Sequence, residues 1–355
     1  MPAPSTSDRK AYFMICIFTA KNVEKSLILA CFKFDCESNC YTLNEIHIFL
    51  GQNKMLIQWY PGHMHKASRE IKAAMEHIDL MIEILDARIP FSSQNPTMAT
   101  LRGDKPCIKV LSKCDLADEK RTQLWQDYLE REKGVKTLAV AMNQPEKIKQ
   151  LTALCHKLVQ RDISTKPLHA LITGIPNVGK STIINVVAGR TIAKTGDEPA
   201  VTKHQQRIDL GDGLVLFDTP GVLWGNIENQ NSGYRLAATG AIKDTAFTHE
   251  DVASWTAEFL LRDYPELVKA RYQLENLPEN ETELLNLIGK KRGCLKSGGK
   301  INLDQVAKIL IGELRSTTLG RITLETPEMV EVELAELEII RAEKAAKKLA
   351  RKKRE

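Results

Sequence analysis

The sequence of 355 residues lacks any run that approaches the roughly 18 unbroken apolar residues of a membrane-spanning helix. This lack excludes an integral membrane protein. A strong charge of one sign is also missing, because 50 lysines and arginines stand against 45 aspartates and glutamates, for a formal net charge of +5. Any affinity for nucleic acid must therefore come from local basic patches.

A disulfide framework is lacking as well. Half of the eight cysteines fall in residues 1–54, and the others are scattered along the chain without a secretory context. This distribution predicts a protein of a reducing cytoplasm. The spacing of Cys31, Cys36 and Cys40 lacks the paired pattern of structural zinc sites, so it does not favour metal binding. We interpret residues 1–54 as a poorly ordered leader or an over-extended reading frame before a functional start at Met55, because every recognisable motif lies after it.

Continuous apolar runs recur after residue 77, and each has the length of a strand buried on both faces of a parallel sheet. Amphipathic segments of helical length, residues 118–131 and 146–160, lie between them. Strands that alternate with helices predict a doubly wound α/β domain with a mostly parallel sheet. The expected strands are residues 78–85, 106–111, 137–141, 168–173 and 214–217.

The pattern changes after about residue 230 and becomes mainly helical. Helices are expected over residues 251–261, 281–288 and 303–314. We therefore predict an α/β domain over residues 55–230, a smaller all-α domain over 231–327, and a charged tail helix over 328–355.

The segment GIPNVGKS at residues 174–181 matches the pattern GxxxxGK[ST], between an expected strand and a helical pattern at 181–188. In this context the pattern predicts a phosphate-binding loop, whose backbone N–H groups surround the phosphates. Lys180 is expected to neutralise the β and γ oxygens, and the Ser181 hydroxyl to bind Mg²⁺. The residues expected to contact the phosphates are Gly174, Asn177, Val178, Gly179, Lys180, Ser181 and Thr182.

Two further elements of a nucleotide switch follow in the chain. The segment DTPG places Asp218 at the end of the 214–217 strand, where its carboxylate can reach Mg²⁺ through water, and Gly221 can offer its N–H to the γ-phosphate. Thr202 is the candidate threonine that completes the Mg²⁺ shell when triphosphate is bound. Together with the phosphate loop, these residues predict a GTPase.

The candidate base site lies upstream of the phosphate loop. Ser112, Lys113, Cys114 and Asp115 resemble the guanine motif NKxD, with serine in place of asparagine. Asp115 can accept hydrogen bonds from the N1–H and exocyclic amine of guanine, and the Lys113 stem can cover the base. The shorter serine is expected to tether the phosphate loop less firmly and to weaken nucleotide affinity. The loop on the ribose side is expected at Ala141 and Met142.

The order of these motifs is informative, because the base motif at 112–115 precedes the phosphate loop, Thr202 and the DTPG segment. In ordinary small GTPases the phosphate loop comes first. The domain therefore looks circularly permuted, with the second switch region, which begins at the DTPG segment of residues 218–221, at the exit into the helical domain.

At this point the chain resembles the circularly permuted GTPases, and most closely the bacterial ones of ribosome biogenesis. The resemblance covers residues 55–327 and rests on IQWYPGHM at 57–64, DARIP at 86–90, GIPNVGKST at 174–182, AKTGDEPAVT at 193–202, DTPGVLW at 218–224, and KRGC and SGG within 291–299. Departures are Ser112, Ala200 where the first switch usually has glycine, and the irregular loop at 141–143.

The resemblance implies a bacterial cytoplasmic GTPase that binds precursors of the large ribosomal subunit, contacts rRNA through its helical domain, and is activated by the particle. Val222 stands where Ras-like enzymes have a catalytic glutamine, and the resemblance points to His63 instead; a structural histidine is the alternative. Asn177 resembles the asparagine that helps to coordinate K⁺ in potassium-activated relatives, although an asparagine that braces the loop fits equally well.

The last 15 residues hold eight basic and two acidic side chains, directly after a stretch with five glutamates and no base. This density favours contact with rRNA phosphates over a merely solvated helix. Lys290, Lys291, Arg292, Lys296 and Lys300 are candidates for a second basic surface. We expect a monomer that is a particle-stimulated GTPase. The alternative is an RNA-binding assembly scaffold that uses GTP mainly as a structural ligand.

Overall fold

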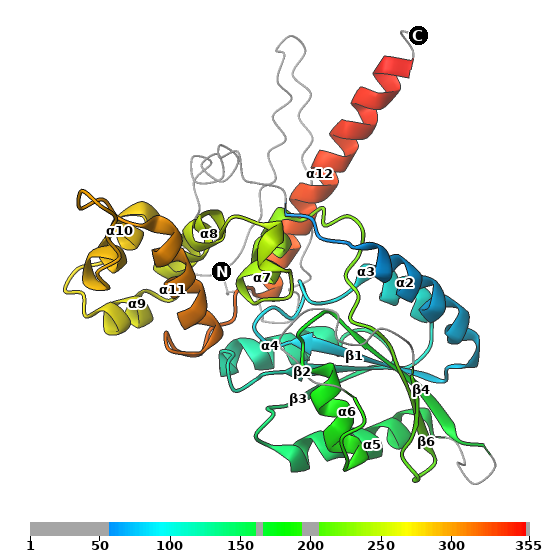
Figure 1. Ribbon diagram of the computed structural model, residues 1–355. Helices are drawn as coiled ribbons and strands as arrows, with labels where there is room; N and C mark the ends of the chain where they lie inside the picture. Colours follow the sequence, from blue (N-terminus) through cyan, green and yellow to red (C-terminus); the bar gives the residue numbers. More distant parts are fainter. Residues whose placement is uncertain (1–56, 161–165, 194–205, 353–355) are drawn as a thin grey trace, which may run out of the picture. The chain divides into compact units, whose positions relative to one another are not determined.

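The computed structural model describes residues 57–160, 166–193 and 206–352 (Figure 1). The chain divides between Asn53 and Lys54 into two units, and the described residues belong to the second. Three sequence predictions fall outside the described residues: the leader with its cysteine cluster, the start at Met55, and the role of Thr202.

The predicted α/β sheet is confirmed. It has six strands in the order β3-β2-β1-β4-β6-β5, and all neighbours are parallel except β5 and β6. The five predicted strands are present with shifted ends, and β5 at the antiparallel edge was not predicted. The strands are β1 (Leu80–Asp86), β2 (Cys107–Ser112), β3 (Val135–Ala139), β4 (Leu168–Gly174), β5 (Gln206–Asp209) and β6 (Leu214–Asp218).

Helices cover both faces of this sheet. In Figure 1, α2 and α3 lie on one side of it, and α5 and α6 lie on the other. Short polar side chains cap the first turns of several helices. Asn95 accepts a hydrogen bond from the backbone N–H of Thr97 at the start of α3, and Asp118 accepts one from that of Arg121 at the start of α4. The helices of this part are α2 (Gly62–Ala74), the 3₁₀ helix η1 (Met75–His77), α3 (Pro96–Arg102), α4 (Glu119–Leu129), α5 (Pro145–Val159) and α6 (Lys180–Ala188).

The chain after β6 is helical, as predicted, and contains two helices that the sequence did not predict, α7 and α9. Helix α7 is buried at every position from Ser232 to Ala238, so neighbouring elements enclose it. The elements are α7 (Gln230–Ala238), the 3₁₀ helix η2 (Asp244–Ala246), α8 (His249–Asp263), α9 (Pro265–Tyr272), α10 (Glu281–Lys291), α11 (Leu303–Arg315) and α12 (Pro327–Lys352). No helix of the described ranges is both long enough and apolar enough to cross a membrane.

The charged tail helix α12 is anchored at its start. Val330 is fully buried in a cluster with Trp125 of α4 and Leu85 of β1. Glu333 receives two hydrogen bonds from the buried Arg235 of α7, of 2.8 and 2.6 Å. From residue 341 onward all the described positions are exposed. The first turns of α12 therefore join the α/β sheet to α7, whereas its basic half is exposed, and Arg341 at the start of that half is ion-paired with Glu228.

Glu325, just before α12, ties the loop after β1 to the helical part. Its carboxylate accepts from the backbone N–H groups of Phe91 and Ser92 at 2.5 and 3.0 Å, and from the Ser92 hydroxyl at 2.5 Å. Nη1 of Arg235 lies 3.4 Å from Oε2 of the same carboxylate. Burial raises the pKa of Glu325, and the Arg235 charge opposes that shift. The fully buried Glu325 therefore holds the loop that follows β1 against α7.

Candidate functional site

The predicted phosphate loop lies between β4 and α6. Gly174 ends β4, where a Cβ atom would lie 2.8 Å from the backbone oxygen of Ile84, so only glycine fits. Asn177 and Gly179 take positive φ angles of 58° and 91°. Helix α6 then begins at Lys180 without a cap from a described side chain. Its first N–H groups are thus available, and such a helix start is suited to bind phosphate.

Lys180 and Asp218 face each other beside this loop. The Lys180 ammonium is ion-paired with Oδ1 of Asp218, and both side chains are buried. Burial lowers the pKa of Lys180 and raises that of Asp218, whereas their mutual attraction opposes both shifts. Oδ2 of Asp218 is buried and has no hydrogen-bond partner among the described residues. An entering phosphate and cation would give both groups new partners.

The orphaned Asp218 oxygen fits a magnesium site. Mg²⁺ takes oxygen ligands, often one or two carboxylates together with phosphates and water. Ser181 in the first turn of α6 carries the hydroxyl that would join Asp218 in holding the ion. When bound, Mg²⁺ would neutralise charge between the β- and γ-phosphates.

The segment after β6 lies against the phosphate loop. A Cβ atom on Gly221 would be 3.1 Å from the Cα of Pro176, so glycine allows this close approach. The N–H of Val222 donates to the carbonyl of Gly174 at 3.1 Å. Gly221 therefore lies beside the loop, and its contact with the γ-phosphate stays a prediction.

Ser112 contacts the phosphate loop, whereas the expected weaker tether and lower nucleotide affinity stay predictions. Its hydroxyl lies 2.6 Å from the carbonyl of Val178 and 2.9 Å from that of Leu85, so its single hydrogen can be donated to either carbonyl. Ser112 is fully buried at the end of β2. Because β1 brings the loop so close to this position, the short serine side chain reaches it.

Lys113 joins the base motif to the same loop. This residue has a positive φ of 57°, and its ammonium donates to the carbonyl of Asn177 at 2.6 Å and to Asp86 at 3.0 Å. Arg88 binds both oxygens of the Asp86 carboxylate, Oδ1 through Nε at 2.9 Å and Oδ2 through Nη2 at 2.7 Å. Burial alone would raise the pKa of Asp86, but the cations of Arg88 and Lys113 outweigh it and hold the pKa well below its usual range.

The remaining base-site residues lie at the same edge of the sheet. Asp115 is half-buried in the turn that follows Lys113, and the N–H of Cys114 donates to the carbonyl of Val140 at 3.2 Å. The Met142 side chain lies against Gly179, since its methyl carbon is 3.6 Å from where a Cβ of that glycine would be. The structure therefore joins the predicted base loop, ribose loop and phosphate loop.

Asn177 forms hydrogen bonds through its side-chain amide and through its backbone carbonyl. Its amide nitrogen donates to the carbonyl of Gly240 after α7 at 2.9 Å, and its own carbonyl accepts from Lys113. This arrangement is the bracing role that the sequence left open. Coordination of K⁺ by Asn177 remains a prediction.

His63 is exposed in the first turn of α2. The segment before it is fixed to the chain that leaves the DTPG motif, because Gln58 makes two hydrogen bonds with the backbone of Ile227, of 3.0 and 3.1 Å. Tyr60 also lies 3.5 Å from the Cβ position of Gly225. His63 thus belongs to a segment held next to the second switch region, and its catalytic role remains a prediction.

Sequence reasoning missed the roles of Asp86, Arg88 and the end of α7. The available signal was the segment DAR, an acid and a base two residues apart at the end of a buried strand. A buried strand end with both charges predicts an internal ion pair. Its partners Lys113 and Thr239 come from distant parts of the chain and had no local signal.

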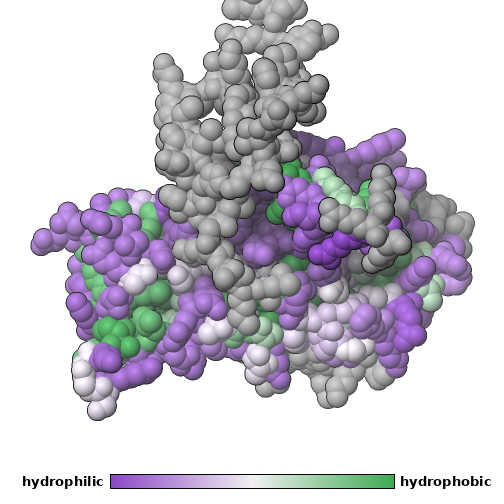
Figure 2. Space-filling view, turned by 90° about the horizontal axis from the view of Figure 1, so that it is seen from above, coloured by the Kyte–Doolittle hydropathy of each residue, from purple (hydrophilic) through white to green (hydrophobic). Residues whose placement is uncertain are grey.

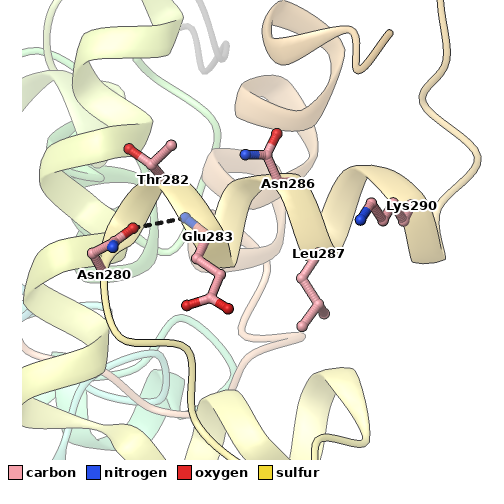
Figure 3. A pocket seen from close by; sticks show the side chains of 6 residues that line it. All are labelled: Asn280, Thr282, Glu283, Asn286, Leu287 and Lys290. Atoms are coloured by element: carbon pink, nitrogen blue, oxygen red, sulfur yellow. Dashed lines mark hydrogen bonds between the residues drawn. The ribbon is translucent and has the colours of Figure 1, made fainter. Parts of the chain in front are cut away.

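A hollow of about 520 Å³ runs along α10, far in the sequence from the nucleotide motifs (Figure 3). In Figure 3 the side chains of Glu283 and Leu287 extend from the same side of the helix, and Asn280 caps its start through the N–H of Glu283. None of its residues belongs to the predicted nucleotide site, although Lys290 is part of the candidate basic surface. The hollow is lined by Asn280, Thr282, Glu283, Asn286, Leu287 and Lys290.

Comparison with known proteins gives the same picture. Residues 169–283 match the family described as 50S ribosome-binding GTPase. The chain is 45% identical over 282 residues to ribosome biogenesis GTPase A of Bacillus cereus, which covers 77% of this chain and 95% of the relative. It is 31% identical over 300 residues to mitochondrial ribosome-associated GTPase 1 of the mouse, at 77% and 91% coverage.

Solved structures agree with this assignment. The fold is similar to GDP-bound YlqF of Thermotoga maritima, with a TM-score of 0.54 and 25% identity, over 73% of this chain and all of that one. The GNP-bound form matches with a TM-score of 0.52 and 26% identity, at 74% and 99% coverage. Together with the assembled guanine and phosphate motifs, these matches show that the chain belongs to the ribosome biogenesis GTPase A family and is a GTP hydrolase.

Proposed function

We propose that this GTPase acts at a late step of large ribosomal subunit assembly, binds pre-ribosomal particles and their rRNA, and hydrolyses GTP in response to them. One observation carries the proposal: Asn177 of the phosphate loop and Arg88, whose partner Asp86 also binds Lys113 of the base motif, are both hydrogen-bonded to the end of α7, where the helical part begins. A change at the pocket can therefore reach the helices, and a contact made by the helices can reach the pocket.

The chain order supports this coupling. The base motif follows β2, whereas the phosphate loop follows β4, which comes later in the chain but nearer the centre of the sheet. This order supports the proposal that the domain is circularly permuted. As a result, the chain that leaves Gly221 passes without a further strand into α7.

Exposed basic residues support the contact with rRNA. The described residues of α12 from Arg341 onward are exposed, and so are Lys290, Lys296 and Lys300 around the end of α10. The N–H of Lys296 donates to the carbonyl of Lys300 at 2.7 Å, so this turn is closed by its own backbone. Among the residues that are coloured in Figure 2, hydrophilic ones predominate, with apolar patches between them. Such charges neutralise phosphates without reading bases.

The residues of the site divide the work of hydrolysis. Lys180 and the α6 N–H groups would bind the phosphates, and Ser181, Thr202 and Asp218 would hold Mg²⁺, with K⁺ at Asn177 as a further cation. Val222 is buried and apolar, so it cannot orient the attacking water. His63, on the segment beside the second switch region, is the proposed group for that task. We propose a monomer in the bacterial cytoplasm.

The test is GTP hydrolysis by the full chain in potassium buffer, with and without large ribosomal subunits. Two variants are compared, His63→Ala and the matched control His65→Ala, because both histidines are exposed in the first turn of α2. Subunits should stimulate the parent and the control strongly. The His63→Ala chain should still bind subunits but lose most of the stimulation.

Two other outcomes contradict the proposal in different ways. Stimulation that survives in His63→Ala removes the catalytic role of His63 but leaves the particle-stimulated GTPase intact. Subunit binding without any stimulation of the parent favours the RNA-binding scaffold that uses GTP as a structural ligand.

A further inference from the structure

The carboxyl end of α7 is paired with side chains from two sides of the molecule. A helix leaves its last carbonyl groups without intrahelical partners, and these groups carry partial negative charge. Here the carbonyls of residues 237–240, which we call the α7 end, each accept a hydrogen bond from a distant side chain. The donors are Arg88, Asn177 and Arg315.

The pocket supplies two of these donors. Arg88 donates from Nη2 to the carbonyl of Thr239 at 3.3 Å, and Asn177 of the phosphate loop donates to that of Gly240 at 2.9 Å. Because a carbonyl only accepts, the nitrogen of the Asn177 amide must face Gly240, and its oxygen faces elsewhere. The α7 end thus fixes the orientation of a side chain in the phosphate loop.

These two donors are also joined inside the pocket. Lys113 of the base motif binds the Asn177 carbonyl at 2.6 Å and Asp86 at 3.0 Å, and Asp86 binds Arg88. The hydrogen bonds therefore form a closed path from the α7 end through Arg88, Asp86, Lys113 and Asn177 back to the α7 end. Displacement of any one member strains the others, because Asp86 and Arg88 are both 3% exposed.

The helical part supplies the third donor. Arg315, the last residue of α11, donates from Nη2 to Ala237 at 2.8 Å and from Nε to Ala238 at 3.0 Å. Its guanidinium also lies 3.4 Å from the Cβ position of Gly240, whose φ of +83° favours glycine. The side chain is only 31% exposed and has a further ion pair with Asp244 at 3.4 Å. A shift of α11 would therefore move the α7 end.

We infer that the α7 end is the contact through which nucleotide binding and the C-terminal helices influence each other, with Arg88 and Arg315 as its positioning residues. The inference rests on the proposed function, because it takes guanine nucleotide as the ligand of the phosphate loop. Phosphates that bind the loop constrain Asn177, and through it the α7 end. By linkage, a change at Arg315 alters nucleotide affinity, although Arg315 belongs to none of the nucleotide motifs.

The test uses the full chain without ribosomes and measures the Kd of fluorescent GDP and of a fluorescent non-hydrolysable GTP analogue. Arg315→Ala removes the two hydrogen bonds to the α7 end. Arg271→Ala is the matched control, since Arg271 makes a similar two-bond contact, but with Glu313 inside the helical part. We expect Arg315→Ala to shift at least one Kd by about fivefold or more, and the control by less than about twofold.

Amide hydrogen exchange gives a second readout. GDP should slow exchange in the peptide that spans residues 236–242 of the parent chain, and this slowing should be lost in Arg315→Ala. Arg315→Lys keeps a cation and one donor, so it should give a smaller change in the same direction and serves if the alanine chain fails to fold.

The outcomes separate the two proposals. Unchanged Kd values together with unchanged nucleotide-dependent exchange in folded Arg315→Ala or Arg315→Lys chains overturn the inference and leave the proposed GTPase intact. A parent chain that binds neither nucleotide overturns the proposed function first. Equal effects of Arg315→Ala and Arg271→Ala on Kd also overturn the inference, because they show a general loosening of the helices.

Discussion

The carboxylate of Asp86 is the charge on which the base motif depends, and Asp86→Asn tests this role. The side chain is 3% exposed and accepts four hydrogen bonds from Arg88 and Lys113, including one from the Arg88 backbone N–H at 3.0 Å. The amide leaves the two cations without their counter-charge. Removal of one partner of a buried ion pair costs roughly 3–5 kcal/mol. Asparagine keeps one carbonyl oxygen, so we expect a loss of about 3 kcal/mol in the free energy of unfolding.

Urea unfolding followed by circular dichroism measures this loss. Asp304→Asn is the matched control, because Asp304 forms an exposed ion pair with Lys308 and should leave stability essentially unchanged. The same Asp86→Asn chain should bind GDP more weakly, because Lys113 loses the anion that holds its stem beside the phosphate loop. A loss of stability below about 1 kcal/mol at an unchanged urea slope would refute the reasoning.

The pH dependence of stability gives an independent check that Asp86 stabilises the folded chain in its ionised form. The pKa of Asp86 is lower in the folded chain than its ordinary value of about 3.9 in an unfolded one. Its stabilisation is therefore complete above that value and is lost as the pH falls toward the folded pKa. The difference between parent and Asp86→Asn should stay constant from about pH 8 to about pH 5 and shrink only below about pH 4. A difference that shrinks between about pH 7 and pH 5 contradicts the assignment to Asp86.

Three further predictions follow from the packing. Gly174→Ala should destabilise the chain by about 1–3 kcal/mol in urea unfolding and weaken GDP binding, because its Cβ would meet a backbone oxygen; unchanged values would contradict the close approach. Glu325→Ala should lower the free energy of unfolding by about 3 kcal/mol in the same assay. Glu325→Gln should lower it less, because the amide oxygen still accepts hydrogen bonds from the loop after β1. Equal losses in the two variants would show that these hydrogen bonds do not contribute to stability. Burial raises the pKa of Cys107 and of Cys155 to about 12, so alkylation near pH 8 should reach the half-buried Cys114 before either of them, and mass spectrometry should find this order abolished in urea.

Much of the sheet could be predicted from the sequence because burial on both faces leaves a local trace. A strand such as β1, buried along its whole length, must be apolar at nearly every position. Helices α10 and α11 likewise show one apolar stripe each. The phosphate loop is equally local, since glycines and a lysine at fixed spacing determine its backbone.

The helices that were missed have weak local signals. Helix α7 reads QNSGYRLAA, in which asparagine, serine and glycine have low helix propensity. Burial of nearly all of its surface stabilises it instead. Helix α9 has eight residues and is separated from α8 by the single residue Tyr264, so Pro265 looks like a helix end when the sequence is taken alone. Strand β5 has three exposed positions out of four and relies on pairing with β6.

The sequence by itself determined which chemical groups this protein carries. These are a phosphate loop, a base motif upstream of it, and an acid at the end of β6, and each of them is specified by a short stretch of residues. Only the tertiary structure decided how these pieces are connected. Ser112 reaches the Val178 carbonyl because parallel strands end at one edge, and Arg88 and Asn177 meet the α7 end across about 150 and 60 residues of chain. Such contacts depend on packing between distant segments, and no local pattern of residues specifies them.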